Sequence, residues 1–128
     1  MLVTKGEVTL HGIDDISEKL DNIINLLNIK KQSFEIKLII SEAVSNAFFH
    51  GNNGDKNKPI SIKWELKECS LKVSVTDCGS GIIVLKNYEE IDENNLLGEC
   101  GRGLYIISCY ADEMKFEGSS IIMKKYLL

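Results

Sequence analysis

The sequence predicts an α+β fold, a two-layer sandwich of three helices packed on a mixed, mostly antiparallel sheet. Two N-terminal segments carry apolar residues at three- and four-residue spacing, which is typical of amphipathic helices. Later segments alternate apolar and polar residues, which is typical of half-buried strands. The chain has 128 residues, and a domain commonly holds about 100 to 200 residues. We therefore expect residues 1–128 to form a single domain.

Composition and net charge restrict the classes of partner that this protein is expected to bind. Hydrophobic residues make up 44% of the chain and charged residues 27%, as in ordinary globular proteins. The net charge of -4 disfavours non-specific attraction to nucleic-acid phosphates. Neither a signal-peptide pattern nor an apolar run of about 20 residues is present. We therefore expect a cytoplasmic protein with no direct nucleic-acid or membrane partner.

The four cysteines do not form a metal-binding pattern. They lie at positions 69, 78, 100 and 109, and zinc sites use more closely spaced ligand pairs. A cytosolic chain with an adequate core usually keeps its thiols reduced. We therefore expect neither a structural metal nor an essential disulfide.

Two helices are predicted in the first half of the chain, after a short strand within residues 2–11. Residues 14–28 carry one apolar stripe. Residues 34–50 form the second predicted helix, with Ser33 as a plausible N-cap and Gly51 as its end. The polar run NNGDKNK that follows is a predicted loop.

The second half reads as two hairpins and one further helix. Residues 60–66 and 71–76 alternate in polarity around the short turn KECS, so they are predicted to pair as antiparallel strands. Residues 82–100 have little periodicity and form a long connection that could act as a lid. A helix is expected over residues 104–110. A final hairpin is expected over residues 114–116 and 121–126.

Polar side chains border the apolar stripe of the second helix. Glu42 and Asn46 are four residues apart, and His50 is one further step along, so a carboxylate, an amide and an imidazole line one edge of the helix. A solvated helix face would explain the same triplet. For His50, a cation stabilised by the helix end is a simple explanation.

A carboxylate then follows the second strand of the first hairpin. Asp77 continues the inward parity of Val73 and Val75, so it points toward the core side, where an unpaired charge is costly. A bound ligand could supply its missing donors. Gly79 and Gly81 come directly after it and would let the backbone approach a ligand closely. An ordinary turn with a capped aspartate is the alternative.

A third polar element precedes the predicted helix at Leu104. Gly101 and Gly103 flank Arg102, and glycines that open a helix leave free amides that favour a phosphate. Taken alone, this Gly-x-Gly would usually be a turn. Arg102 could reach a phosphate or remain a surface cation.

In combination, the segments EAVSNAFFHGN (42–52), DCGSGI (77–82) and GRGL (101–104) resemble the N, G1 and G2 boxes of the GHKL ATP-binding superfamily. Within it, the sequence is most similar to the anti-sigma regulatory factors that are serine-protein kinases. The resemblance covers about residues 33 to 127, including the terminal GSSIIMKKYL. It implies a Bergerat-type ATP-binding fold and a histidine kinase-like ATPase domain that uses ATP and Mg²⁺.

The resemblance also implies roles for individual residues. Asn46 would ligate Mg²⁺, Glu42 would activate the attacking hydroxyl, and Asp77 would accept a hydrogen bond from the adenine amino group. Ser119 or Ser120 occupies the place of a family threonine near that aspartate, and Ser120 is the residue we include. The expected nucleotide-binding residues are Asn46, His50, Asp77, Gly79, Gly81, Gly101, Arg102, Gly103 and Ser120.

The function that the resemblance implies is that of an anti-sigma factor and serine-protein kinase. It would bind a sigma factor and transfer the γ-phosphoryl group of ATP to a serine of an anti-sigma antagonist. The family commonly works as a homodimer. An alternative is a catalytically silent module that holds ATP and captures a partner, although simple binding needs no carboxylate at Glu42. A histidine-phosphorylating sensor kinase is disfavoured, because the residues before Ser33 are too few for a phosphoacceptor helix pair.

Overall fold

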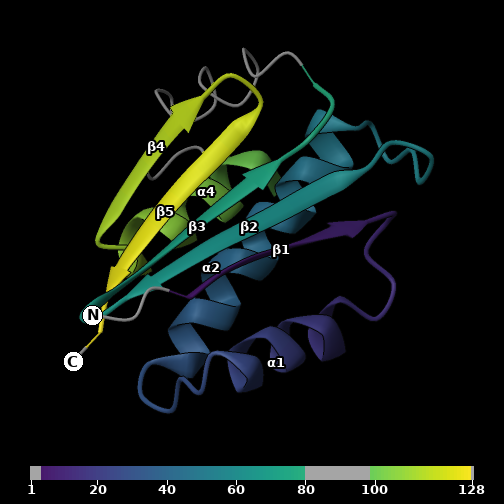
Figure 1. Cartoon of the computed structure of the whole chain (residues 1–128). Coiled ribbons are helices and arrows are strands. Elements are labelled where there is room, and N and C mark those ends of the chain that lie inside the picture. The colour runs from purple at the N-terminus through teal and green to yellow at the C-terminus, as the bar shows by residue number, and fades with distance from the viewer. Residues whose placement is uncertain (1–3, 80–98, 128) are drawn as a thin grey trace.

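One five-stranded sheet carries helices on one of its faces (Figure 1). The computed structural model describes residues 4–79 and 99–127. The strand order is β1-β2-β3-β5-β4, and all neighbouring strands of this described sheet pair antiparallel. The predicted two-layer α+β architecture is therefore confirmed, with a fully antiparallel sheet in place of the mixed one expected.

The bounds of most elements agree with the sequence patterns. The helices are α1 (Ile16–Leu26), α2 (Ser33–Asn46), the π-helical turn η1 (Ala47–Gly51) and α4 (Glu99–Tyr110). The strands are β1 (Thr4–Leu10), β2 (Ile60–Lys67), β3 (Ser70–Thr76), β4 (Glu113–Glu117) and β5 (Ser120–Tyr126). Within the described residues, no helix is long and apolar enough to cross a membrane.

The second helix differs from its prediction at both ends. Ser33 is the first helical residue and not the N-cap, which is Gln32 in a left-handed conformation (φ 63°) without a side-chain cap. The Gln32 side chain instead donates a hydrogen bond to the main-chain oxygen of Tyr126 (3.2 Å). At the other end, regular α-helix stops at Asn46 and continues as the wider turn η1.

The core fills the space between the sheet and the helices. Alternate residues of each inner strand point inward, so that Ile62, Val75 and Ile121 lie side by side across three strands. The apolar stripes of α1, α2 and α4 cover this surface. The fully buried large side chains are Leu10, Leu20, Ile36, Ile39, Ile40, Ile60, Ile62, Leu104, Ile107, Met123, Val44 and Val75.

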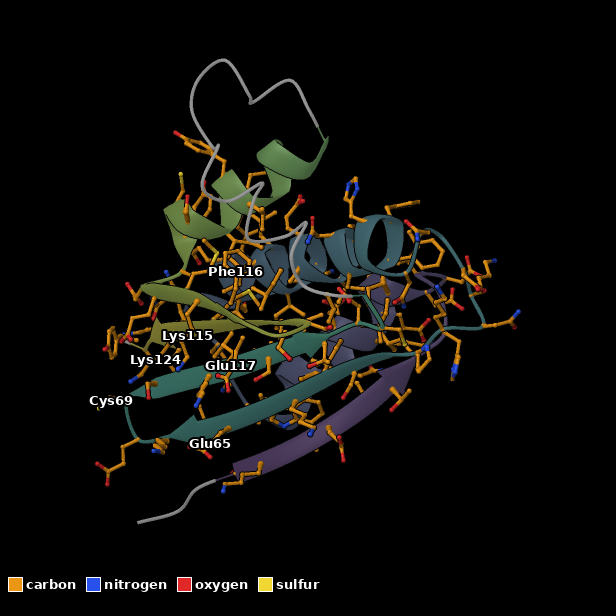
Figure 2. The ribbon with its side chains drawn as sticks, turned by 90° about the horizontal axis from the view of Figure 1, so that it is seen from above. Glu65, Cys69, Lys115, Phe116, Glu117 and Lys124 are labelled. Carbon is orange, nitrogen blue, oxygen red and sulfur yellow. The ribbon has the colours of Figure 1, made fainter. Side chains whose placement is uncertain are left out.

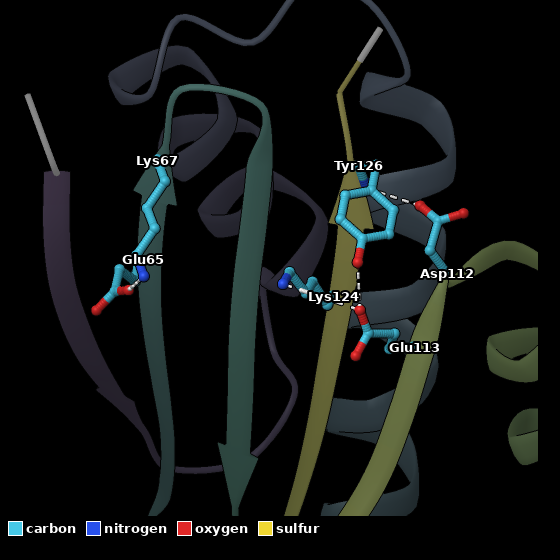
Figure 3. Close-up of polar contacts among 6 residues, drawn as sticks. All are labelled: Glu65, Lys67, Asp112, Glu113, Lys124 and Tyr126. Atoms are coloured by element: carbon cyan, nitrogen blue, oxygen red, sulfur yellow. Dashed lines mark hydrogen bonds and ion pairs between the residues drawn. The ribbon is translucent and has the colours of Figure 1, made fainter. Parts of the chain in front are cut away.

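The other face of the sheet carries charged side chains. Glu65, Lys115, Glu117 and Lys124 project from its strands (Figure 2). Lys67 forms an ion pair with Glu65 (3.2 Å), and Glu113 accepts a hydrogen bond from the Tyr126 hydroxyl (2.5 Å; Figure 3). Exposed pairs of this kind contribute little net stability.

Candidate functional site

The candidate residues gather where α2 and β3 both end, at one end of the molecule (Figure 1). Strand β3 ends at Thr76, and the Asp77 N–H donates to the main-chain oxygen of Ser119 in the β4–β5 turn (3.1 Å). On the helix side, Gly51 of η1 lies directly against the Asp77 carboxylate. Residues predicted from separate motifs therefore meet in space.

The Asp77 carboxylate is half-buried and has few protein partners. The Gly79 N–H donates to its Oδ1 (2.6 Å). In the described part of the chain, no lysine, arginine or histidine forms an ion pair with it. Burial raises the pKa of Asp77, and the hydrogen bond from Gly79 opposes that rise. A desolvated carboxylate with spare acceptor capacity is suited to a ligand that brings its own donor.

Two glycines allow the main chain to close around this carboxylate. A Cβ atom on Gly51 would lie 2.0 Å from Asp77 Oδ2, and one on Gly79 would lie 2.8 Å from the Gly51 oxygen. Such distances are far below van der Waals contact, so neither position accommodates a side chain without movement. The sequence indicated this close approach for Gly79, but for Gly51 it indicated only a helix end.

The amide of Asn46 is buried and incompletely paired. Its side chain is 5% exposed, and Nδ2 has no hydrogen-bond partner among the described residues. Buried amide groups are normally paired, and the assignment of oxygen and nitrogen within the amide follows from its partners. The unpaired atom is the donor Nδ2, and exchanging Nδ2 with Oδ1 would turn an oxygen to the open position, as a ligand for the hard cation Mg²⁺ requires.

Glu42 lies one turn before Asn46 on α2 and faces α4. Its side chain is half-buried, and a Cβ atom on Gly103 would lie 3.2 Å from Glu42 Oε2. The absent side chain of Gly103 therefore makes room for this carboxylate. Helices α2 and α4 pack together, which holds Glu42 at their contact.

Helix α4 begins earlier than the sequence indicated. It starts at Glu99 and not at Leu104, so Gly101 and Gly103 lie in its first two turns. An α-helix leaves about four N–H groups unpaired at its start, and for a helix that begins at Glu99 these include the N–H groups of residues 99–101. Gly101 is in this set and Gly103 follows it. Gly101 is therefore among the free amides at the helix start, which are the kind that can bind a phosphate, whereas Gly103 makes room for Glu42.

Several predicted features lie outside the parts that the structure describes. Gly81 falls within residues 80–98, as does most of the predicted lid at 82–100. The helix backbone at Arg102 is described but its side chain is not. His50 lies in η1 and is partly buried, and its imidazole forms no hydrogen bond or ion pair with the described residues.

The two serines of the β4–β5 turn point in opposite directions. The Ser120 hydroxyl is 2.6 Å from the Thr76 hydroxyl, its register partner, on the outer face of the sheet. The Ser119 hydroxyl donates to the main-chain oxygen of Gly79. The structure thus brings Ser119 to the candidate site and places Ser120 away from it, contrary to the choice of Ser120 from the sequence.

Sequence reasoning did not single out Asn52. Its side chain is 0% exposed, and its Nδ2 donates to the oxygens of Lys58 (3.1 Å) and Pro59 (3.3 Å). Its Oδ1 accepts a hydrogen bond from the Cys78 N–H (2.8 Å). An asparagine after a helix-ending glycine reads as an ordinary loop residue, so no local signal could have identified these contacts.

Comparisons with known proteins identify the family of the chain. Residues 19–125 match the model of the histidine kinase-like ATPase domain. A serine-protein kinase RsbW of Listeria innocua is 28% identical over 102 residues, which cover 73% of this chain and 65% of that relative. The chain thus spans just under two-thirds of the length of the Listeria relatives.

Proteins named anti-sigma F factor are similar over a comparable region. The one from Shouchella clausii is 34% identical over 100 residues, covering 73% of this chain and 68% of the relative. The one from Clostridium perfringens is 34% identical over 101 residues, covering 71% and 70%. The resemblance inferred from the three glycine- and asparagine-containing segments is confirmed, and the chain belongs to the histidine kinase-like ATPase domain family.

Proposed function

We propose that the chain is an ATP-dependent anti-sigma factor and serine-protein kinase. The observation that carries the proposal is the half-buried carboxylate of Asp77, which has no cationic partner among the described residues. It is enclosed by the main chain of Gly51 and Gly79, next to the helix that bears Asn46 and Glu42. The names of the relatives, serine-protein kinase and anti-sigma F factor, indicate the proposed partners, a protein that is phosphorylated on serine and a sigma factor.

The proposed nucleotide contacts follow from the donors and acceptors at the site. Asp77 accepts a hydrogen bond from the adenine amino group, which satisfies its spare acceptor capacity. Ser119 supports the loop at Gly79 that closes this pocket. Amides at the start of α4, including that of Gly101, face the phosphates. Asn46 provides an oxygen ligand to Mg²⁺, which neutralises phosphate charge when bound.

Phosphoryl transfer requires an acceptor hydroxyl next to Glu42. The serine oxygen of the antagonist forms a bond to the γ-phosphorus, the bond to the β–γ bridging oxygen breaks, and ADP leaves. Glu42 takes the hydroxyl proton, so the charges and atoms balance. The position of Glu42 at the contact of α2 and α4, facing Gly103, supports this role over that of a solvated helix residue.

The experiment combines the purified protein, γ-labelled ATP with Mg²⁺, and candidate antagonist and sigma proteins encoded near its gene. Label should appear on one antagonist serine and be absent when that serine is replaced by alanine. A native protein that binds ATP and a sigma factor but labels no antagonist would favour the ATP-dependent binding module instead. A native protein that binds no ATP would refute both readings.

A further inference from the structure

We propose that Asn52 is a positioning residue that fixes Asp77 and thereby sets the preference of the site for adenine over guanine. The inference rests on the proposed nucleotide function and assigns a specific task to a residue outside the expected nucleotide contacts. Asn52 itself does not need to touch the nucleotide.

The side chain of Asn52 joins three separate segments of the chain. It follows η1 in the sequence, its Nδ2 holds the main-chain oxygens of Lys58 and Pro59 just before β2, and its Oδ1 holds the N–H of Cys78 just after β3. With an exposed fraction of 0%, the amide has no access to solvent. Buried hydrogen bonds that are all satisfied make a local arrangement rigid and unique.

The contact with Cys78 bears directly on Asp77. The Cys78 N–H belongs to the peptide group that also contains the Asp77 carbonyl, so its hydrogen bond to Asn52 fixes the direction in which the main chain leaves Asp77. On the other side, the Asp77 N–H is held by the Ser119 oxygen. Asp77 is thus anchored at both of its flanking peptide groups, and Asn52 provides one of the two anchors.

A second consequence concerns Gly51, the residue before Asn52. Gly51 fits against Asp77 so closely that a Cβ atom would lie 2.0 Å from Oδ2. Because Asn52 bonds to the segment after Asp77, it also holds Gly51 in register with the carboxylate. Without that bond, the space between η1 and the end of β3 can open, and the carboxylate gains freedom to rotate.

The preference for adenine over guanine should depend on the Asn52 hydrogen bonds more strongly than the affinity for the nucleotide as a whole depends on them. A site that reads one hydrogen bond discriminates strongly only while its polar group is held in place. The phosphate end depends on Asn46 of α2 and the amides of α4, to which Asn52 makes none of its side-chain hydrogen bonds. Loss of the anchor should therefore lower the ratio of GTP to ATP dissociation constants and leave the Mg²⁺ dependence in place.

Two substitutions separate positioning from general structural support. Asn52→Ala removes all three side-chain hydrogen bonds, whereas Asn52→Asp keeps an oxygen that can accept from the Cys78 N–H and loses the donors to Lys58 and Pro59. Calorimetry with ATP and with GTP, below the melting temperature of each variant, gives the ratio. We expect it to fall by about tenfold or more in Asn52→Ala and to stay within about threefold of native in Asn52→Asp, although both lose stability.

An unchanged ratio in Asn52→Ala, or an equal loss in both variants, would overturn the proposal. If Asn52→Ala does not fold, hydrogen exchange of the native protein tests the same hydrogen bond. The Cys78 N–H must then be strongly protected in the absence of nucleotide, and rapid exchange at Cys78 would refute the proposed role of Asn52. A native protein that binds no ATP refutes the nucleotide function. One that binds ATP with the expected discrimination, but with insensitive Asn52 variants, refutes only the role of Asn52.

Discussion

Gly51→Ala is expected to disable the adenine end of the site through one added methyl group. The new Cβ atom would lie 2.0 Å from Asp77 Oδ2, 2.2 Å from Cγ and 2.7 Å from Oδ1. Non-bonded carbon and oxygen atoms pack at about 3.5 Å, so the carboxylate or the main chain of η1 must move by more than about 1 Å. The Gly79 N–H, which donates to Oδ1, would lose its partner in such a movement.

The size of the effect follows from the contacts that are lost. Overpacking costs about 1–3 kcal/mol of folding stability. A displaced carboxylate also forfeits its hydrogen bond to adenine, and bonds to charged groups contribute about 1.5–3 kcal/mol, or roughly 10- to 150-fold in affinity. ATP affinity should therefore fall by at least about tenfold, and discrimination against GTP should fall with it.

Gly118→Ala is the matched control for stability. Gly118 has φ 60° in the β4–β5 turn, and a Cβ atom there would meet no atom within 4 Å. The left-handed conformation alone costs about 1–2 kcal/mol, so both variants should lose stability to a comparable extent in thermal unfolding. Only Gly51→Ala should lose ATP binding in calorimetry. Native affinity and stability in Gly51→Ala would refute the close packing of Gly51 against Asp77.

Four further predictions concern two ionisable groups, the buried amide of Asn46 and the contact between α2 and α4. Burial raises the pKa of Asp77, so its ionised form costs stability at neutral pH, and that cost disappears as the pH falls through the folded-state pKa. Without nucleotide, Asp77→Asn should therefore be more stable than the native protein at pH 7, and the difference in the free energy of unfolding should shrink as the pH is lowered. In calorimetry, the same variant should no longer discriminate adenine from guanine nucleotides. Glu42→Gln should keep ATP affinity within about tenfold and lower phosphotransfer by roughly 10² or more, whereas Asn46→Ala should lose Mg²⁺-dependent nucleotide binding. Gly103→Ala should raise the melting temperature, since alanine is favoured over glycine in a helix by about 1 kcal/mol. The same variant should slow phosphotransfer, because its Cβ atom would lie 3.2 Å from Glu42 Oε2 and crowd that carboxylate. A variant that is more stable and equally active would contradict this role of Gly103.

The helices and strands were predictable because buried apolar residues recur in the sequence with the spacing of the element that carries them. Val73 and Val75 face the helices and Lys72 and Ser74 face away, so one face of β3 is apolar in the sequence and buried in the structure. The same alternation in β2 and the helical spacing in α1 gave their types and approximate bounds. The alternation of β3 also predicts that Asp77 lies on the helix side of the sheet, where Gly51 contacts it.

Features that depend on the register between distant segments were not predictable. Ser119 and Ser120 are adjacent in the sequence, and only the pairing of Ser120 with Thr76 determines which of them reaches Gly79. The start of α4 at Glu99 was also missed, because glycines at 101 and 103 lower helix propensity. There the packing of Gly103 against Glu42 overrides local preference.

The π-helical turn η1 gives the clearest reason why the site needs a departure from regular structure. The Asn52 N–H donates to the Ala47 oxygen (2.8 Å), five residues back, where a continued α-helix would bond four residues back. The wider turn changes the direction of the residues that follow, and it brings Gly51 against Asp77 and Asn52 to Cys78. In the proposed nucleotide site, helix α2 can then hold Glu42 and Asn46 near the phosphates while its extension η1 packs against Asp77, the carboxylate proposed to bind adenine. Removing one residue from η1 would restore α-helical spacing, and we expect it to separate these two functions by abolishing adenine discrimination without moving Glu42.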